Sequence, residues 1–287
     1  MAFKKEELQT RFWASASIVV TIGLLLYFSY YFSVAIIMTV VFSGLILLAQ
    51  WEFHHMAAQK GLHEQSLIYL ASPLFVGSVF MASFNSSWAP VPLIVLGSFV
   101  FLLLMQHFIY NQEPITRISI SLMGLLYVVV PLSFPIKITF MSYVEGPSGQ
   151  WWVMFLILVT KASDIGAYFF GKSIGKHYLA PKISPKKTYE GLIGGILFSV
   201  IACFAIIYLT PSALKILNYP WLYAIVLGIA LSVIGLLGDL AESIIKRDAG
   251  VKDSNKLKGF GGLLDLFDSL IFTSPAFYLF LMFGKFV

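Results

Sequence analysis

The chain alternates between long apolar runs and short polar stretches, and this pattern predicts its secondary structure. An apolar run of about 20 residues is long enough for a helix to cross the hydrocarbon core of a bilayer. Pro131 and Pro135 should kink or end the run at 118–135, the fifth of nine. The nine runs lie at 12–32, 33–52, 67–84, 89–109, 118–135, 150–170, 191–209, 220–243 and 262–284. The pattern predicts an all-α, polytopic integral membrane protein with about nine transmembrane helices.

The composition agrees with this prediction. Hydrophobic residues make up 59% of the 287 residues and charged residues 11%, whereas a soluble domain has roughly a quarter charged residues. Cys203 is the single cysteine and lies in an apolar run, which excludes a disulfide framework and a thiolate zinc site. The net charge is +5. Because the basic residues lie in short loops between apolar runs, they indicate membrane topology rather than binding to nucleic acid.

The basic residues also predict how the chain is oriented. With nine spans, 15 of the 19 Lys and Arg residues fall on one side of the membrane, three fall on the other, and Lys161 lies within a span. The positive-inside rule therefore places the N-terminus in the cytoplasm. We expect one membrane domain, 1–287, in which 1–135 forms a lipid-facing scaffold and 136–287 carries the catalytic helices and loops.

Four aspartates fall at similar depths in three of these helices. Asp164 and Asp239 lie eight and seven residues before the basic cytoplasmic ends of their runs, and Asp265 and Asp268 follow the start of the last run. At 1.5 Å rise per residue, Asp164, Asp239 and Asp268 lie on the order of 10 Å below one surface. Ionisable residues within a membrane usually mark functional sites. Crowded carboxylates repel one another unless a cation joins them, and their oxygens suit Mg²⁺.

Each aspartate also has a structural interpretation. Asp265 could stabilise the positive end of its helix, where acidic residues are common. Asp164 could form an ion pair with Lys161, three residues earlier on the same helix face. Asp239 has no basic residue before Lys246 on its own helix, so a purely structural role suits it less well. The shared depth is stronger support for a functional site than any single aspartate.

Two basic loops flank these helices on the cytoplasmic side. The loop 172–190 contains ISPKKTYEG, and the loop 246–258 is followed by GFGGLLD. Such loops could simply hold the orientation and contact anionic lipid head groups. They could also bind phosphate, since basic side chains and free N–H groups at a helix start both do so. The candidate substrate-binding residues are Ser184, Lys186, Lys187, Lys246, Arg247, Lys252, Asp253, Gly261 and Gly262.

Other polar residues fit surface positions better. His54, His55 and His63 share one loop without a matching carboxylate cluster, and we expect them at the surface. Glu52 and His107 lie at the ends of predicted spans, where an interfacial role is expected.

The C-terminal half resembles the phosphatidate cytidylyltransferase family, also called CDP-diacylglycerol synthases. The family pattern is S-x-x-K-R, then K-D, then G-G-x-x-D-x-x-D, and here it is formed by Ser243, Lys246, Arg247, Lys252, Asp253, Gly261, Gly262, Asp265 and Asp268. Asp239, ISPKKTYEG, and Asp164 within KASDIGAYFFGK also resemble family elements. The chain departs from the pattern at three positions, where the family has Pro, His and Arg and this sequence has Lys258, Phe260 and Leu266.

The resemblance implies transfer of a cytidylyl group from CTP to phosphatidate, giving CDP-diacylglycerol and pyrophosphate for phospholipid biosynthesis. It implies Mg²⁺ held by Asp239, Asp265 and Asp268, with Asp164 as a further catalytic residue. A second cation, such as another Mg²⁺ or K⁺, would steady the reacting oxygens. The implied location is a bacterial inner membrane, with the active site facing the cytoplasm. Whether the protein forms a homodimer is left open.

Two other functions are compatible with these residues. A CTP-dependent lipid or polyprenol kinase would move the γ-phosphate to a lipid alcohol with the same metal and basic loops. A cation-coupled transporter would also carry intramembrane aspartates, often in repeated halves near the midplane. The acidic layer lies away from the midplane and beside basic loops, and this position favours chemistry at the membrane surface.

Overall fold

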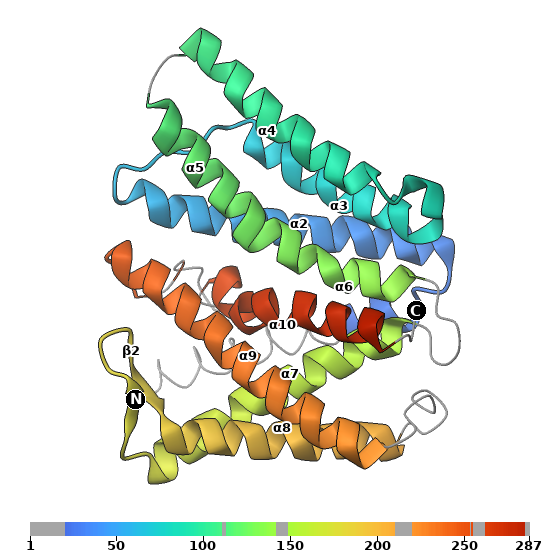
Figure 1. The fold of residues 1–287 in the computed structure, drawn as a ribbon, viewed down its shortest axis with the longest axis vertical. Coiled ribbons are helices and arrows are strands. Elements are labelled where there is room, and N and C mark those ends of the chain that lie inside the picture. Colours follow the sequence, from blue (N-terminus) through green and yellow to red (C-terminus); the bar gives the residue numbers. More distant parts are fainter. Residues whose placement is uncertain are drawn as a thin grey trace, which may run out of the picture. The chain divides into compact units, whose positions relative to one another are not determined.

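Helices make up nearly all of the structure, a computed structural model that describes residues 21–110, 113–141, 149–209, 220–252, 254 and 262–284 (Figure 1). Helical residues 21–27 come first. The elements that follow are α2 (Phe32–Ala58), α3 (Ile68–Phe84), η1 (Ser86–Trp88), α4 (Val91–Tyr110), α5 (Pro114–Gly124), the π-helical η2 (Leu125–Val129), α6 (Val130–Phe140), α7 (Gly149–Ile174), β1 (Tyr178–Ala180), β2 (Ser184–Thr188), α8 (Tyr189–Leu209), α9 (Pro220–Asp248) and α10 (Leu263–Phe283).

The predicted all-α, polytopic membrane architecture is confirmed. In the described part of the chain, seven helical segments are long and apolar enough to cross a membrane, and α3 is a shorter apolar helix. These eight segments match the predicted runs from 33–52 to 262–284. Residues 12–20 of the first run, 12–32, lie outside the described residues, so the count of nine and the side of the N-terminus stay predictions.

Pro131 and Pro135 do not end their helix, which continues to Phe140. A proline inside a helix removes one N–H and crowds the carbonyl group four residues earlier. For Pro131 that carbonyl belongs to Tyr127, which lies within the π-helical turn Leu125–Val129. In a π-helical turn the backbone hydrogen bonds join residues five apart, so the turn is wider than an α-helical turn. This wider turn accommodates the proline, and the segment continues as one span.

The chain forms two compact units. Unit 1 contains Met1–Ile136 and Ala249–Leu266, and unit 2 contains Lys137–Asp248 and Phe267–Val287. The boundary after Ile136 lies next to the sequence-based division at 135, but the segment before α10 returns to unit 1. In unit 1, α2 packs against α3 and α5 around buried apolar side chains such as Ile46 and Ile68.

In unit 2, small residues let the helices approach closely. Ser163 of α7 donates a 2.7 Å hydrogen bond to Ser232 of α9. A Cβ atom added at Gly195 of α8 would lie 3.1 Å from the Ser163 hydroxyl and 3.2 Å from the Ser232 hydroxyl. The buried rings of Trp152, Phe155 and Phe277 fill the core between α7 and α10. Packing through small residues is typical of membrane helices, whose association lacks a strong hydrophobic driving force.

We expect Gly166→Ala to destabilise unit 2. The added Cβ would lie 2.4 Å from the carbonyl oxygen of Gly194 and 2.6 Å from the Cβ of Phe198, so α7 and α8 would have to separate. Overpacking of this kind costs about 1–3 kcal/mol. Thermal unfolding in detergent measures the loss. Gly97→Ala is the control, since a Cβ there meets nothing within 4 Å. Equal melting temperatures for the two variants would contradict this account of the packing.

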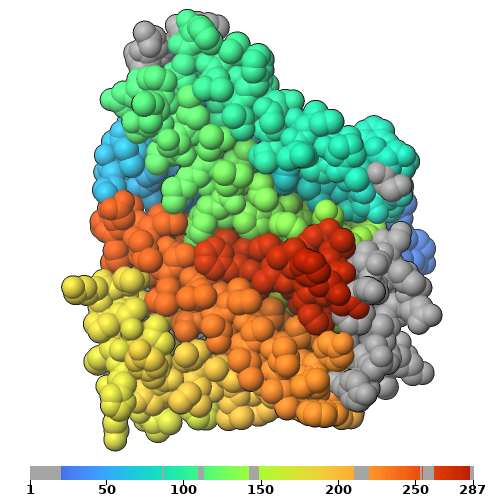
Figure 2. Space-filling view, in the orientation of Figure 1, coloured from blue at the N-terminus to red at the C-terminus, as the bar shows by residue number. Residues whose placement is uncertain are grey.

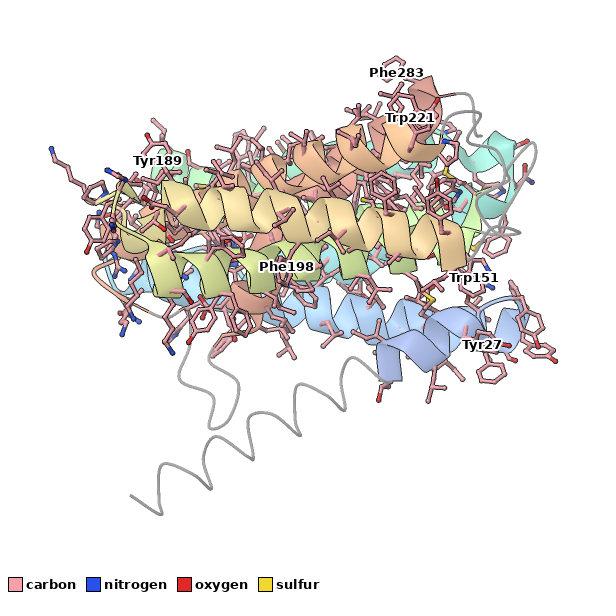
Figure 3. All side chains as sticks on the ribbon, turned by 90° about the horizontal axis from the view of Figure 1, so that it is seen from below. Tyr27, Trp151, Tyr189, Phe198, Trp221 and Phe283 are labelled. Atoms are coloured by element: carbon pink, nitrogen blue, oxygen red, sulfur yellow. The ribbon has the colours of Figure 1, made fainter. Side chains whose placement is uncertain are left out.

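A two-stranded antiparallel hairpin interrupts the helices, which the all-α prediction did not include. β1 pairs with β2 in register Tyr178 with Thr188 and Ala180 with Ser184. The Thr188 hydroxyl accepts the N–H of Gly191 at 3.1 Å and caps the start of α8. The hairpin protrudes from one end of unit 2 (yellow in Figure 2). Tyr189 lies at this end, whereas Trp221 and Phe283 lie at the other end of the unit (Figure 3).

Candidate active site

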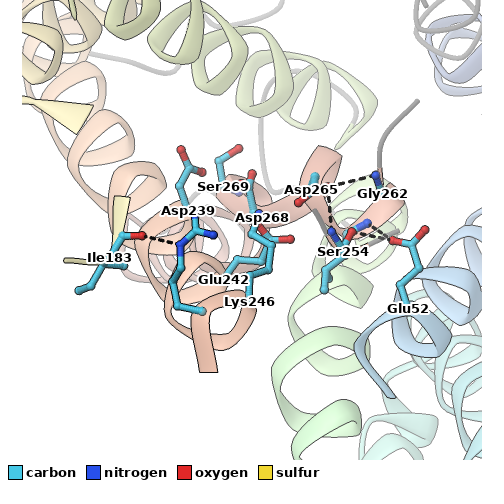
Figure 4. Close-up of polar contacts among 12 residues, drawn as sticks. Glu52, Ile183, Asp239, Glu242, Lys246, Ser254, Gly262, Asp265, Asp268 and Ser269 are labelled. Carbon is cyan, nitrogen blue, oxygen red and sulfur yellow. Dashed lines mark hydrogen bonds and ion pairs between the residues drawn. The ribbon is translucent and has the colours of Figure 1, made fainter. Parts of the chain in front are cut away.

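The polar centre of unit 2 is a cluster of carboxylates and lysines contributed by α7, β2, α9 and α10. Three ion pairs join it. Lys161 Nζ lies 3.0 Å from Asp164 Oδ2, Lys187 Nζ lies 3.1 Å from Asp239 Oδ2, and Lys246 pairs with the fully buried Glu242. Asp268 lies close enough to Asp239 and Glu242 to interact with both carboxylates (Figure 4). We call Asp164, Asp239, Glu242 and Asp268 with Lys161, Lys187 and Lys246 the acidic cluster.

The acidic cluster has more negative than positive charge. Among the described residues, its four carboxylates face three ammonium groups, and Asp268 is in none of the three ion pairs. Oδ1 of Asp268 accepts the N–H of Ser269 at 2.6 Å. Oδ1 of Asp239 is buried and has no hydrogen-bond partner among the described residues. A buried carboxylate oxygen without a donor is costly, so Asp239 and Asp268 together form a place where a cation would be stabilised.

Local structure explains how these side chains meet. A Cβ at Gly238 would lie 2.5 Å from the carbonyl oxygen of Asp268, so glycine is needed for α9 to approach α10 there. Lys161 Nζ also donates to the Ser269 hydroxyl at 3.4 Å and joins α7 to α10. Arg247 Nε donates to the carbonyl oxygen of Ile183 at 3.2 Å and joins the end of α9 to the hairpin turn. The hairpin is thereby held where Lys187 reaches Asp239.

The start of α10 belongs to unit 1 and contains Asp265 and Gly262. Asp265 Oδ2 accepts the N–H of Gly262 at 3.0 Å and the N–H of Ser254 at 3.3 Å. Asp265 therefore stabilises the start of α10, which is the structural interpretation that its place in the sequence left open. The suggestion that free N–H groups cradle phosphate here does not hold for Gly262, because its N–H donates to Asp265.

The predicted site residues thus divide into three groups. Unit 2 brings together Asp164, Asp239 and Asp268 with Lys187, Lys246 and, through the hairpin, Arg247, Ser184 and Lys186. Unit 1 contains Asp265, Gly262 and the exposed Lys252. Asp253 and Gly261 lie outside the described residues.

Sequence reasoning missed Glu242 and misplaced Glu52 and His54. Glu242 follows Asp239 by three residues, the same spacing as Asp265 and Asp268, and this repeat was the available signal. The expectation that Glu52 is interfacial and His54 is at the surface is wrong, since both are buried in unit 1. No local pattern marks either residue, because the partners that bury them are distant in sequence.

The acidic cluster fits a magnesium ion that is held by two carboxylates together with water and substrate phosphates. In the described part of the chain, no three His, Cys, Asp or Glu side chains form a group that could hold a metal ion by themselves. Mg²⁺ is usually bound by one or two carboxylates together with water and substrate phosphates. Asp239, with its buried unpartnered oxygen, and Asp268, outside the ion pairs, fit this arrangement. The three-aspartate ligand set stays a prediction.

Comparison with known proteins identifies the family. A profile of the cytidylyltransferase family matches residues 10–283. The chain belongs to this family. A phosphatidate cytidylyltransferase of Staphylococcus aureus (strain COL) is 33% identical over 252 residues, which cover 84% of this chain and 94% of that protein. The resemblance seen in the C-terminal motifs is therefore confirmed.

Other relatives share only part of their length with the chain. A phosphatidate cytidylyltransferase of Chlamydia pneumoniae is 42% identical over 168 residues, 57% of this chain. One from Chlamydia trachomatis is 40% identical over 176 residues, 60% of this chain. The chain spans 54% and 57% of the length of these two relatives.

Proposed function

We propose that this protein transfers the cytidylyl group of CTP to phosphatidate, forming CDP-diacylglycerol and pyrophosphate. The observation that carries the proposal is the acidic cluster, in which carboxylates of membrane-spanning helices adjoin Lys187 of a polar hairpin. Both substrates are rich in phosphate, and one of them is anchored in lipid. Family membership and the names of the relatives support the same reaction.

The reaction requires positioning and charge neutralisation more than proton transfer. A phosphate oxygen of phosphatidate attacks the α-phosphorus of CTP, and the bond from that phosphorus to the bridging oxygen of the β-phosphate breaks. Pyrophosphate leaves with the bonding electrons. The attacking phosphate monoester is already ionised near neutral pH, so no general base is needed. The protein contributes by holding two anions in line and by stabilising the charge that develops.

Different side chains of the acidic cluster would bind the metal ion and orient the charged groups. Asp239 and Asp268 would hold Mg²⁺, with the predicted ligand Asp265 one turn earlier on α10. When bound, the ion would neutralise the phosphate oxygens of CTP. Lys187 orients Asp239 through their ion pair and presents a positive charge beside it. Asp164 holds Lys161 in the same way. The predicted second cation, Mg²⁺ or K⁺, belongs to the proposal as well.

We further propose that the site faces the cytoplasm from a bacterial inner membrane. The hairpin carries Lys182 and Lys186 in addition to Lys187 of the acidic cluster, and the end of α9 carries Arg247 next to Lys246. Basic loops are retained on the cytoplasmic side, where CTP is available. The lipid tails of phosphatidate would stay in the bilayer.

Labelled CTP tests the reaction. With purified protein in liposomes containing phosphatidate, we expect label from the α-phosphate of CTP in the lipid product and none from the γ-phosphate. Liposomes containing a lipid alcohol instead of phosphatidate should give no labelled lipid. Transfer of the γ-phosphate to that alcohol would show a lipid kinase, and ion uptake without labelled lipid would show a transporter.

A further inference from the structure

A buried carboxylate of α2 contacts the start of α10 in unit 1. Glu52 is 1% exposed. Its Oε2 accepts the N–H of Leu264 at 2.8 Å and the hydroxyl of Ser254 at 3.1 Å. Both partners lie more than 200 residues further along the chain, at separations of 212 and 202. Figure 4 shows Glu52 beside Ser254, with Asp265 and Gly262 above the serine.

The helix needs such an acceptor because it lacks an ordinary cap. The first N–H groups of any helix have no partner within the helix, and the side chain of the N-cap residue usually accepts one of them. Here the residue before Leu263 is Gly262, which has no side chain. A Cβ at Gly262 would lie 1.5 Å from the Ser254 hydroxyl oxygen, so no larger residue fits. Glu52 supplies the missing acceptor from another helix.

Two carboxylates hold the same serine. The hydroxyl of Ser254 donates to Glu52, and its N–H donates to Asp265 Oδ2 at 3.3 Å. Asp265 Oδ2 also accepts the N–H of Gly262. Glu52, Ser254 and Asp265 therefore form one hydrogen-bonded chain from α2 to the first turn of α10. We call these three residues the α10 anchor.

We propose that Glu52 is a positioning residue, which fixes Ser254 and the first turn of α10 and thereby the direction in which that turn presents Asp265. A negative charge is also favourable at the positive end of a helix. The same contacts occupy the N–H groups of Gly262 and Leu264, so these two groups are not available to bind phosphate. The kinetic consequence rests on the proposed function, whereas the structural consequence does not.

Hydrogen exchange of the full-length protein in lipid nanodiscs, without substrate, tests the anchor directly. In Glu52→Ala the N–H of Leu264 loses its acceptor and the hydroxyl of Ser254 loses its partner. We expect the amide of Leu264, and with it that of the neighbouring Gly262, to exchange at least about tenfold faster, since the first turn can then open locally. Glu52→Gln should change exchange less, because its amide oxygen still accepts. Ser72→Ala is the matched control, since it removes a buried hydrogen bond between α3 and Gln50 of α2.

The outcomes separate the two interpretations. Faster exchange at α10 in Glu52→Ala but not in Ser72→Ala supports the anchor. Unchanged exchange at α10, or an equal increase in both variants, overturns it. If Glu52→Ala does not fold, Ser254→Ala replaces it, because that change removes only the hydroxyl donated to Glu52. Faster exchange at the start of α10 supports the proposal there too, and unchanged exchange overturns it.

Kinetics complete the test. Misplacing a catalytic group by about 1 Å can cost on the order of 100-fold in rate, so we expect kcat of Glu52→Ala to fall about 10- to 100-fold. The KM for CTP should change less than about threefold, because positioning acts on the chemical step. Glu52→Gln should recover most of the activity. An unchanged kcat overturns the positioning role. If the wild type makes no CDP-diacylglycerol, the proposed function fails, and the exchange measurement still decides the anchor.

Discussion

Asp268→Asn is expected to reduce cytidylyl transfer by about a thousandfold or more, the largest effect of any single change in the acidic cluster. Asp268 is the carboxylate outside the three ion pairs, and it interacts with Asp239, whose buried Oδ1 has no hydrogen-bond partner in the described part of the chain. Removing its charge takes away the excess of negative charge that would hold a cation. Losing one group that stabilises developing charge typically costs 10²- to 10³-fold, and loss of the metal adds to that. Turnover of labelled CTP measures the effect.

Magnesium binding gives a second measurement that does not depend on turnover. A ligand present at 100 times its Kd raises the free energy of unfolding by about 2.7 kcal/mol. Titration with MgCl₂ and CTP should therefore raise the melting temperature of the wild type and leave that of Asp268→Asn nearly unchanged. Asp164→Asn is the matched control. Asp164 is paired with Lys161, so the control should keep the thermal shift and lose less activity. If MgCl₂ and CTP raise the melting temperature of Asp268→Asn as much as that of the wild type, the assignment of Asp268 as a metal ligand is wrong.

The depth of the aspartates was predictable because helix geometry is regular. With a fixed rise per residue, counting from the basic ends placed Asp164, Asp239 and Asp268 at one level, and unit 2 brings their helices together there. The same count places Asp265 slightly nearer the surface, and the structure puts it in unit 1, where it caps its helix and holds Ser254. Spacing along one helix gives depth, but it does not say which way a side chain turns at a helix end.

Contacts between distant segments could not be predicted. Glu52 looked interfacial because its partners, Ser254 and Leu264, are more than 200 residues away. The sequence also contained no sign of the hairpin. β2 has the sequence SPKKT, which lacks the alternation of apolar and polar residues that marks a half-buried strand. Its backbone pairing is instead supported by contacts of Arg247 and Glu190 with the hairpin and the residues before it.

Lys187→Ala is expected to lower kcat/KM about 100-fold. Lys187 Nζ lies 3.1 Å from Asp239 Oδ2, and both side chains are 22% exposed. Its removal takes away the positive charge that balances Asp239 and that would attract a substrate phosphate to the proposed metal site. A positive group aimed at developing negative charge is worth on the order of 10²-fold in rate. Lys187→Arg should recover activity only in part, since the planar guanidinium cannot replace a compact ammonium group in the same contact.

Lys186 provides the comparison that separates position from charge. It is the neighbouring residue of β2, carries the same charge and is exposed, so Lys186→Ala changes the net charge of the hairpin by the same amount. We expect less than about a fivefold loss, and that loss should shrink at high salt because exposed charges are screened within about 10 Å at 0.1 M. The loss in Lys187→Ala should persist at high salt, because its pair with Asp239 is largely buried. Equal losses with equal salt dependence would show that the hairpin contributes only general attraction, and that the ion pair with Asp239 has no special role in turnover.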